Sequence, residues 1–198
     1  KVYDNAKVSG AAIISGEAEV SGYARVWGNA QVSGSAKVSS YAQVSGDAEL
    51  SGNAIVWGEA EVFGNAQVFG NARVGGNAKV SGDAEVLGEA EVCDRAKVRD
   101  NSIVCGEVEV SGSAKVSGNA KVSGNAKVAE LGDVIVFENH WSSGRHFTYT
   151  KSNKMWKVGC FYGTGQELIK KAYRDSKTSG DHYKYYVDFV EGLERLDE

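Results

Sequence analysis

The sequence contains no proline and only three cysteines among its 198 residues. Glycine-rich disordered segments normally carry proline as well, so 25 glycines without a single proline indicate regular turns. An odd number of cysteines argues against the disulfide framework of a secreted protein. No stretch approaches the roughly 18 consecutive apolar residues of a membrane span, and the first residues lack the apolar run of a signal peptide. We therefore expect a soluble, cytoplasmic protein.

An excess of charge of one sign is also lacking. The formal net charge is −4, with 12 Lys and Arg against 16 Asp and Glu in residues 1–132, and 10 against 10 in residues 133–198. A domain that binds nucleic acid normally carries a clear excess of basic residues. The balance argues against a nucleic-acid partner, and the missing apolar span argues against a membrane partner.

What the sequence does contain is a six-residue repeat. Every sixth residue from 2 to 128 is aliphatic: of these 22 positions, 20 are Val, and the others are Ile14 and Leu50. Two residues before each later member, 19 of 21 positions are Ala, and two residues after, 17 of 21 are Gly. The unit is Ala-x-Val-x-Gly-x, and no insertion interrupts it.

This repeat predicts short strands joined by corners. Alternation places Ala and Val on one face of each strand, and the glycine supplies the corner. A six-residue strand and corner cannot bury its own apolar face, so the units must stack on copies of themselves. Three sides per turn make a triangular coil of three repeats, and residues 1–132 make about seven coils.

The pattern resembles the left-handed parallel β-helix of hexapeptide-repeat proteins, whose best-known members are acyltransferases. Its glycine lies one place later than in the commonest transferase pattern, so it is more similar to the repetitive Val-Ser-Gly-Asn-Ala proteins of bacteria and phages. The left-handed sense is implied by the resemblance alone, because the general rule for crossovers favours a right-handed coil. We predict a mainly β fold, with this helix over residues 1–132, in a bacterial or phage-infected cell.

A second, small α/β domain is expected over residues 133–198. Twelve aromatic side chains lie in this segment, against seven in the segment before it, which is twice as long. Strands are predicted at residues 134–137, 145–150 and 155–158, with turns at 141–144 and 151–154. Two helices follow: one of about ten residues behind the capping-box pattern Thr164 to Glu167, and one that starts after residues 179–181. Covering the open end of the β-helix is the minimum role of this domain.

A short segment of the second domain carries a further resemblance. Residues 159–164, with Glu167 and Leu168 behind them, are similar to a C-terminal module of uncharacterised phage and bacterial proteins. The resemblance implies no activity for this chain.

Candidate chemistry is scarce in the repeat. Hexapeptide acyltransferases use a histidine base and a protruding loop, and the carbonic anhydrases of this fold need several histidine ligands for zinc. All three histidines, His140, His146 and His182, lie beyond residue 132. Cys93 and Cys105 are two repeats apart, which places them on different sides of the triangle. We predict no catalytic residue, no metal site and no cofactor, and we disfavour an acyltransferase.

The second domain leaves two possibilities for chemistry. His140, His146 and Cys160 could form a nucleophile with a base. We favour the interpretation that Cys160 is a buried strand residue and that the histidines are surface or turn residues. Basic and aromatic residues alternate at positions 151–157 and 170–174 and could contact nucleic acid, but the balanced charge favours solvated faces.

Exceptions to the polar outer surface indicate where a partner binds. Counting along the chain in whole coils assigns them to faces, and Tyr23 and Tyr41 should stack at a corner. The candidate partner-binding residues are Phe69, Leu87, Ile103 and Cys105 on one face, Ile55 and Trp57 on a second, Trp27 and Phe63 on the third, and the corner residues Tyr23 and Tyr41. An apolar stripe of this kind could form the seam of a homotrimer, a docking site for the C-terminal domain or a surface that binds a protein partner. The alternative is that these are scattered surface aromatics that pack on one another.

The sequence therefore predicts a non-catalytic structural or protein-binding rod that presents a rigid surface. The C-terminal domain acts as its cap or as an interaction module. One alternative is a phage-encoded inhibitor of a bacterial enzyme or defence complex. Another is an enzyme that uses the second domain or a trimer interface, with the hexapeptide acyltransferase as the disfavoured form.

Overall fold

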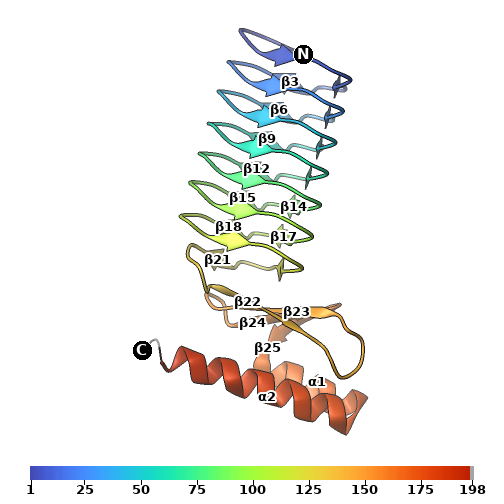
Figure 1. The fold of residues 1–198 in the computed structure, drawn as a ribbon, viewed down its shortest axis with the longest axis vertical. Coiled ribbons are helices and arrows are strands. Elements are labelled where there is room, and N and C mark those ends of the chain that lie inside the picture. Colours follow the sequence, from blue (N-terminus) through green and yellow to red (C-terminus); the bar gives the residue numbers. More distant parts are fainter. Residues whose placement is uncertain (197–198) are drawn as a thin grey trace.

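A computed structural model describes residues 1–196; residues 197 and 198, the last of the predicted second domain, lie outside the described residues. Figure 1 shows a column of stacked triangular coils, with a small sheet and two helices at its C-terminal end. The fold is a parallel β-solenoid of about seven coils, as predicted. Its left-handed sense stays a prediction from the resemblance.

Three parallel seven-stranded sheets form the sides of the solenoid. We name each side after its first strand. The β1 face contains β1 (Lys7–Val8), β4 (Arg25–Val26), β7 (Gln43–Val44), β10 (Glu61–Val62), β13 (Lys79–Val80), β16 (Lys97–Val98) and β19 (Lys115–Val116). The β2 face contains β2 (Ile13–Ile14), β5 (Gln31–Val32), β8 (Glu49–Leu50), β11 (Gln67–Val68), β14 (Glu85–Gly88), β17 (Ile103–Gly106) and β20 (Lys121–Val122). The β3 face contains β3 (Glu19–Val20), β6 (Lys37–Val38), β9 (Ile55–Val56), β12 (Arg73–Val74), β15 (Glu91–Val92), β18 (Glu109–Val110) and β21 (Lys127–Val128).

The inward Ala and Val side chains fill the solenoid. From residue 18 to residue 128 every one of them is at most 1% exposed. The register joins equivalent positions of successive coils, as in the pairs Val44 with Val62 and Val62 with Val80. Each coil donates backbone N–H groups to the next; the Ser45 N–H, for example, donates to the Val62 carbonyl at 3.0 Å. Burial of small apolar side chains and the coil-to-coil hydrogen bonds therefore hold the stack together.

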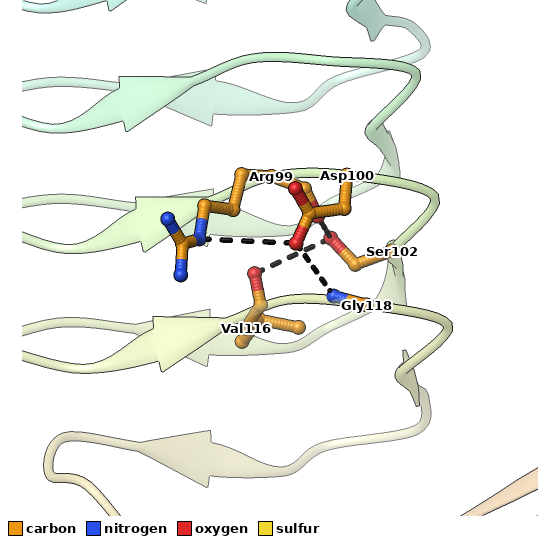
Figure 2. Close-up of polar contacts among 5 residues, drawn as sticks. All are labelled: Arg99, Asp100, Ser102, Val116 and Gly118. Carbon is orange, nitrogen blue, oxygen red and sulfur yellow. Dashed lines mark hydrogen bonds and ion pairs between the residues drawn. The ribbon is translucent and has the colours of Figure 1, made fainter.

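Ser102 is a polar residue inside this apolar core, in the place of an alanine. Its hydroxyl donates to the Arg99 carbonyl at 2.7 Å and lies 3.4 Å from the Val116 carbonyl (Figure 2). A buried hydroxyl costs little when it has such partners. The repeat therefore tolerates serine at this position.

Aspartate replaces glycine at three corners of the solenoid. The corner residue has a positive φ, near +55° to +64° at these aspartates. Each carboxylate accepts a hydrogen bond from the backbone N–H at the same corner of the next coil: Asp4 from Gly22 (3.1 Å), Asp94 from Gly112 (2.9 Å) and Asp100 from Gly118 (2.9 Å; Figure 2). These bonds offset the cost of a left-handed backbone at a residue with a Cβ.

The C-terminal domain packs one antiparallel sheet against two helices. The sheet has the order β22 (Val134–Glu138), β23 (His146–Thr150), β24 (Met155–Val158) and β25 (Phe161–Thr164). Three of these strands were predicted; β25 was not. The side chains at the centre of its core are those of Phe147, Tyr149, Trp156, Leu168, Tyr183, Val187 and Val190.

The helices are α1 (Gly165–Asp175) and α2 (Lys177–Glu194). The capping box between Thr164 and Glu167 is confirmed. The predicted start of α2 after residues 179–181 is wrong, because Ser176 is the N-cap and accepts the Ser179 N–H at 3.0 Å. Gly180 therefore lies inside α2, where an added Cβ would be 2.2 Å from the Tyr173 ring. This glycine marks a close helix contact and not a helix start.

The C-terminal sheet covers the last coil (Figure 1). Within residues 1–196 no further coil follows β20 and β21 to accept their N–H groups, and two hydroxyls of the C-terminal domain accept them instead. The Lys121 N–H donates to Thr148 Oγ1 at 2.9 Å, and the Lys127 N–H donates to Ser152 Oγ at 2.8 Å. The Tyr162 hydroxyl donates to the Ser123 carbonyl at 3.1 Å. The expected capping contact is therefore present in the structure.

We expect Thr148→Val to lower the free energy of unfolding by about 1 to 3 kcal/mol, because the Lys121 N–H loses its acceptor. Valine has nearly the same shape as threonine, so the packing of the side chain changes little. Thr148 is only 1% exposed, so water cannot replace its hydroxyl readily. Urea denaturation followed by circular dichroism measures the change. Thr148→Ser keeps the hydroxyl and is the control; equal losses in both variants would show that packing, and not the hydrogen bond, stabilises this contact.

Candidate functional site

The candidate partner-binding residues lie on all three faces of the solenoid. Counting in whole coils assigned them correctly to columns, as the register pair Leu87 with Cys105 on the β2 face shows. Tyr23 and Tyr41 form the predicted stack, with ring centroids 5.1 Å apart and an interplanar angle of 6°.

Exposure divides the candidates into two groups. Tyr23 and Tyr41 are 54% and 58% exposed, and Trp27 and Phe63 are 36% and 38% exposed. All four side chains belong to the β1 face or to the corner that leads into it. The other six candidates are half-buried: Ile55, Trp57, Phe69, Leu87, Ile103 and Cys105. Among the candidate residues, those of the β1 face and its corner are therefore the most accessible to a partner.

Trp57 is covered by its own neighbours on the β3 face. Its indole lies across Gly75, where an added Cβ would be 2.2 Å from the ring. The Arg73 guanidinium lies over the same ring, 5.2 Å from its centroid, in a cation–π contact. Trp57 thus packs against other outer residues of its own face, which is the alternative that the sequence left open for such residues.

The candidate residues of the β2 face form a stripe that leads to the C-terminal domain; they are Phe69, Leu87, Ile103 and Cys105. Cys105 Sγ lies 3.2 Å from Ser123 Oγ, one coil further along the column. The Ser123 carbonyl accepts the Tyr162 hydroxyl of the C-terminal domain. A Cβ at the neighbouring Gly124 would be 2.0 Å from that hydroxyl oxygen, so the contact is close. The end of this stripe therefore adjoins the docked domain.

Three grooves follow the β1 face. The first, of about 440 Å³, is lined by Asn5, Lys7, Tyr23, Arg25, Tyr41 and Gln43. The second, of about 150 Å³, is lined by Trp27, Gln43, Ser45, Glu61 and Phe63. The third, of about 500 Å³, is lined by Asn77, Lys79, Arg95, Lys97, Ser113 and Lys115. Aromatic side chains thus line the first two grooves, and basic side chains line the third.

The basic residues of this face were missed from the sequence. Whole-coil steps align Lys79, Lys97 and Lys115, so the columns used for the apolar residues contained the signal. The net charge of residues 1–132 is negative and concealed it. A column-by-column reading of charge would have found these lysines.

The histidine and cysteine group of the second domain is only partly assembled. His146 and Cys160 line one pocket of about 220 Å³ together with Arg145. His140 lies elsewhere, with its ring centroid 5.6 Å from that of His182. Cys160 is exposed in the turn before β25, so the prediction of a buried strand residue is wrong. The physical reason is Gly159, whose φ of +56° turns the chain there.

Cys93 and Cys105 lie on different faces, as predicted: Cys93 follows β15 on the β3 face, and Cys105 belongs to β17 on the β2 face.

Among residues 1–196 no group of three or more His, Cys, Asp or Glu side chains is arranged to hold a metal ion. The six-residue spacing of the strands continues without a loop from β1 to β21.

A polar cluster lies in a pocket of about 380 Å³ between the C-terminal sheet and α2. The Tyr149 hydroxyl donates to Glu194 Oε1, and Lys154 Nζ lies 3.3 Å from Glu194 Oε2. Burial raises the pKa of Tyr149 above its usual range, and the hydrogen bond to Glu194 and the nearby carboxylates raise it further. The folded state therefore favours the neutral phenol.

This raised pKa makes stability depend on alkaline pH. The contribution is complete below the ordinary tyrosine pKa of about 10, and it is lost as pH rises above that value, by up to about 1.4 kcal/mol per pH unit. We expect Tyr149→Phe to flatten the fall in the free energy of unfolding between about pH 10 and 11. Denaturation at several pH values measures it, with Tyr185→Phe, an exposed position, as the control. An unchanged slope in Tyr149→Phe would contradict the assignment.

Neither α1 nor α2, within the part of the chain that the structure describes, is long and apolar enough to cross a bilayer.

Fold and surface together define a parallel β-solenoid with a small α/β domain at one end. The sequence model of one family, described as the YdcK beta solenoid repeat, matches residues 66–82, the segment that contains β11, β12 and β13. This similarity covers about one coil. No curated protein matches the chain, and no solved structure matches it.

Proposed function

We propose that this protein is a non-catalytic, protein-binding rod and that it binds its partner through the β1 face. The observation that carries the proposal is the gathering of all four exposed candidate aromatics on that face and at the corner that leads into it: Trp27, Phe63, Tyr23 and Tyr41. Tyrosine and tryptophan are enriched among the residues that contribute most to protein–protein binding. A solenoid side with grooves beside such residues suits an elongated partner.

Preorganisation supports this proposal. The fully buried Ala and Val columns fix the backbone beneath the β1 face. The stacked rings of Tyr23 and Tyr41 hold each other in place, so little side-chain entropy is lost when a partner covers them. Arg25 and Gln43 line the same groove and supply polar groups for orientation.

The other possibilities are narrower forms of this proposal or compete with it. An inhibitor of a bacterial enzyme or defence complex is a rod whose partner is that target. The resemblance to repetitive bacterial and phage proteins of the hexapeptide-repeat class supports this version. A homotrimer would be self-association. An acyltransferase would require a catalytic base, and the repeat contains no histidine in its sequence.

We expect Tyr41→Ser to weaken partner capture by tenfold or more, because it removes one ring of the stacked pair that lines the first groove. The tagged full chain, the variant and a Phe69→Ser control on the β2 face are incubated with lysate of the source cell. Mass spectrometry identifies the bound proteins, and light scattering measures self-association. A stoichiometric companion that Tyr41→Ser loses and Phe69→Ser retains supports the proposal. Equal capture by both variants contradicts it.

A further inference from the structure

The basic groove of the β1 face lies over β13, β16 and β19. Its lysines are stacked in register: Lys79 pairs with Lys97, and Lys97 pairs with Lys115. Neighbouring strands are about 4.8 Å apart, and like charges directly opposite one another are destabilising. The only other pair of cations in register, Lys7 with Arg25, also lies on this face of the described chain. On the β3 face, by contrast, Lys37 and Lys127 each pair with a glutamate in the adjacent coil, at 3.7 and 3.4 Å.

Three cations of the groove have no internal counterion. Lys79 is neutralised by Glu61 at 2.9 Å. Arg95, Lys97 and Lys115 are exposed, and within residues 1–196 none of them makes an ion pair. This arrangement costs free energy in the isolated protein unless an anion from outside offsets the repulsion.

Nearby carboxylates are directed to other partners. Asp94 accepts the Gly112 N–H, and Asp100 accepts the Gly118 N–H while it lies 3.8 Å from Arg99 Nε (Figure 2). No acidic side chain lines the groove itself; its remaining lining residues are Asn77 and Ser113. The groove is therefore polar and basic, which suits a ligand with several negative charges.

The spacing of the lysines selects the form of that ligand. Lys79 and Lys115 are two coils apart, about 9.6 Å along the rod. Residues i and i+7 of an α-helix lie about 10.5 Å apart, with i+3 or i+4 between them. In an extended strand, side chains of one face recur at intervals of about 6.6 Å, which fits the lysine spacing less well.

We propose that this groove binds an acidic α-helix of the protein partner, with Asp or Glu at positions i, i+3 or i+4, and i+7 along the rod. The inference rests on the proposed function and names the chemistry of the partner. Lys79 already has Glu61 as its counterion, so Lys97 and Lys115 contribute most of the attraction. Glu61 also limits the acidic stretch, because a fourth carboxylate would face it one coil beyond Lys79. The helix would then continue with apolar residues toward Trp27 and Phe63, which line the neighbouring groove.

The test uses defined probes and the full chain. The first peptide is a labelled, alanine-rich helix of about six turns with glutamates along one face. The second has the same composition with its glutamates spread around the helix, and the third probe is a single-stranded oligothymidine. The variant Lys97→Glu/Lys115→Glu is compared with Lys37→Glu/Lys121→Glu, which changes the net charge equally on the other two faces. Fluorescence anisotropy at several salt concentrations measures binding.

We expect the one-faced peptide to bind the wild-type chain at least tenfold more tightly than the spread peptide. The Lys97→Glu/Lys115→Glu variant should bind the one-faced peptide at least tenfold more weakly than the wild type does, and the control variant less than twofold more weakly. Equal binding of both peptides, or no binding of either, overturns the proposal. Tighter binding of the oligothymidine, lost in the same variant, overturns it in favour of a nucleic-acid surface.

The cellular partner separates this inference from the proposed function. If the Lys97→Glu/Lys115→Glu variant captures the partner as well as the wild type does, while Tyr41→Ser loses it, the acidic-helix inference fails and the protein-binding rod stands. If Tyr41→Ser also captures it fully, the proposed function fails as well.

Discussion

Replacing Leu50 by alanine is expected to lower the free energy of unfolding by about 3 kcal/mol or more, the usual range for a buried leucine. Leu50 is the only leucine in the column of inward aliphatic residues and is fully buried. It pairs in register with Val32 and Val68. Backbone hydrogen bonds from the coils on both sides hold the solenoid walls at fixed spacing, so the walls cannot collapse into the cavity.

Urea denaturation followed by circular dichroism measures this loss. Leu87→Ala is the matched control, because Leu87 lies on the outer surface of the same face and is half-buried. We expect the control to lose less than half as much. Equal losses at the two positions would mean that the inward column does not dominate the stability of the rod.

The second large effect is expected at a corner. Gly58 has a φ of +72°, and an added Cβ would lie 2.8 Å from the Gly76 carbonyl oxygen of the next coil. A left-handed residue with a Cβ costs about 1 to 2 kcal/mol, and the forced separation of two coils costs a further 1 to 3 kcal/mol. We therefore expect Gly58→Ala to lower the free energy of unfolding by about 3 kcal/mol.

Gly58→Asp should cost less than Gly58→Ala, although aspartate is larger. Asp94 and Asp100 occupy equivalent corners and accept an N–H from the next coil. A hydrogen bond of this kind recovers about 1 kcal/mol. Gly118→Ala is the control, because its φ is similar but no atom lies within 4 Å of the added Cβ. If aspartate destabilises this corner as much as alanine does, the hydrogen bonds at the natural aspartates do not explain their presence.

The solenoid could be predicted from the sequence because its order is local. Each strand depends on the inward alternation of Ala and Val and on a glycine two positions later, and each coil repeats the previous one after three units. The same periodicity is enough to place Tyr23 over Tyr41. Ser102, in contrast, breaks the repeat, and only the carbonyls of Arg99 and Val116 explain why a buried hydroxyl is tolerated.

The second domain was less predictable because its contacts are non-local. Strand β25 pairs with β24 through a turn at Gly159, and no pattern in the four residues of β25 indicates a strand. Cys160 is exposed for the same reason. Gly180 indicated a helix start in the sequence, whereas the ring of Tyr173 explains it in the structure. The structure at such positions depends on which elements pack together, and the periodicity of the sequence carries no information about that.

The candidate surface was predicted in part. Apolar exceptions identified Tyr23, Tyr41, Trp27 and Phe63, but sequence could not distinguish these exposed rings from Trp57, which packs onto Gly75. The basic columns were overlooked because net charge hides local alignment.

Site-specific photo-crosslinking tests most directly whether the β1 face binds the partner. Ser39, Ser45 and Ser51 follow β6, β7 and β8, so one coil offers a half-buried serine on each of the three faces. Benzoylphenylalanine is introduced at each position in turn, and the variants are irradiated in the presence of the captured partner. The proposed function predicts a strong crosslink from position 45 and weak or no crosslinks from positions 39 and 51. A strongest crosslink from position 39 or 51, or equal crosslinks from all three, would contradict it.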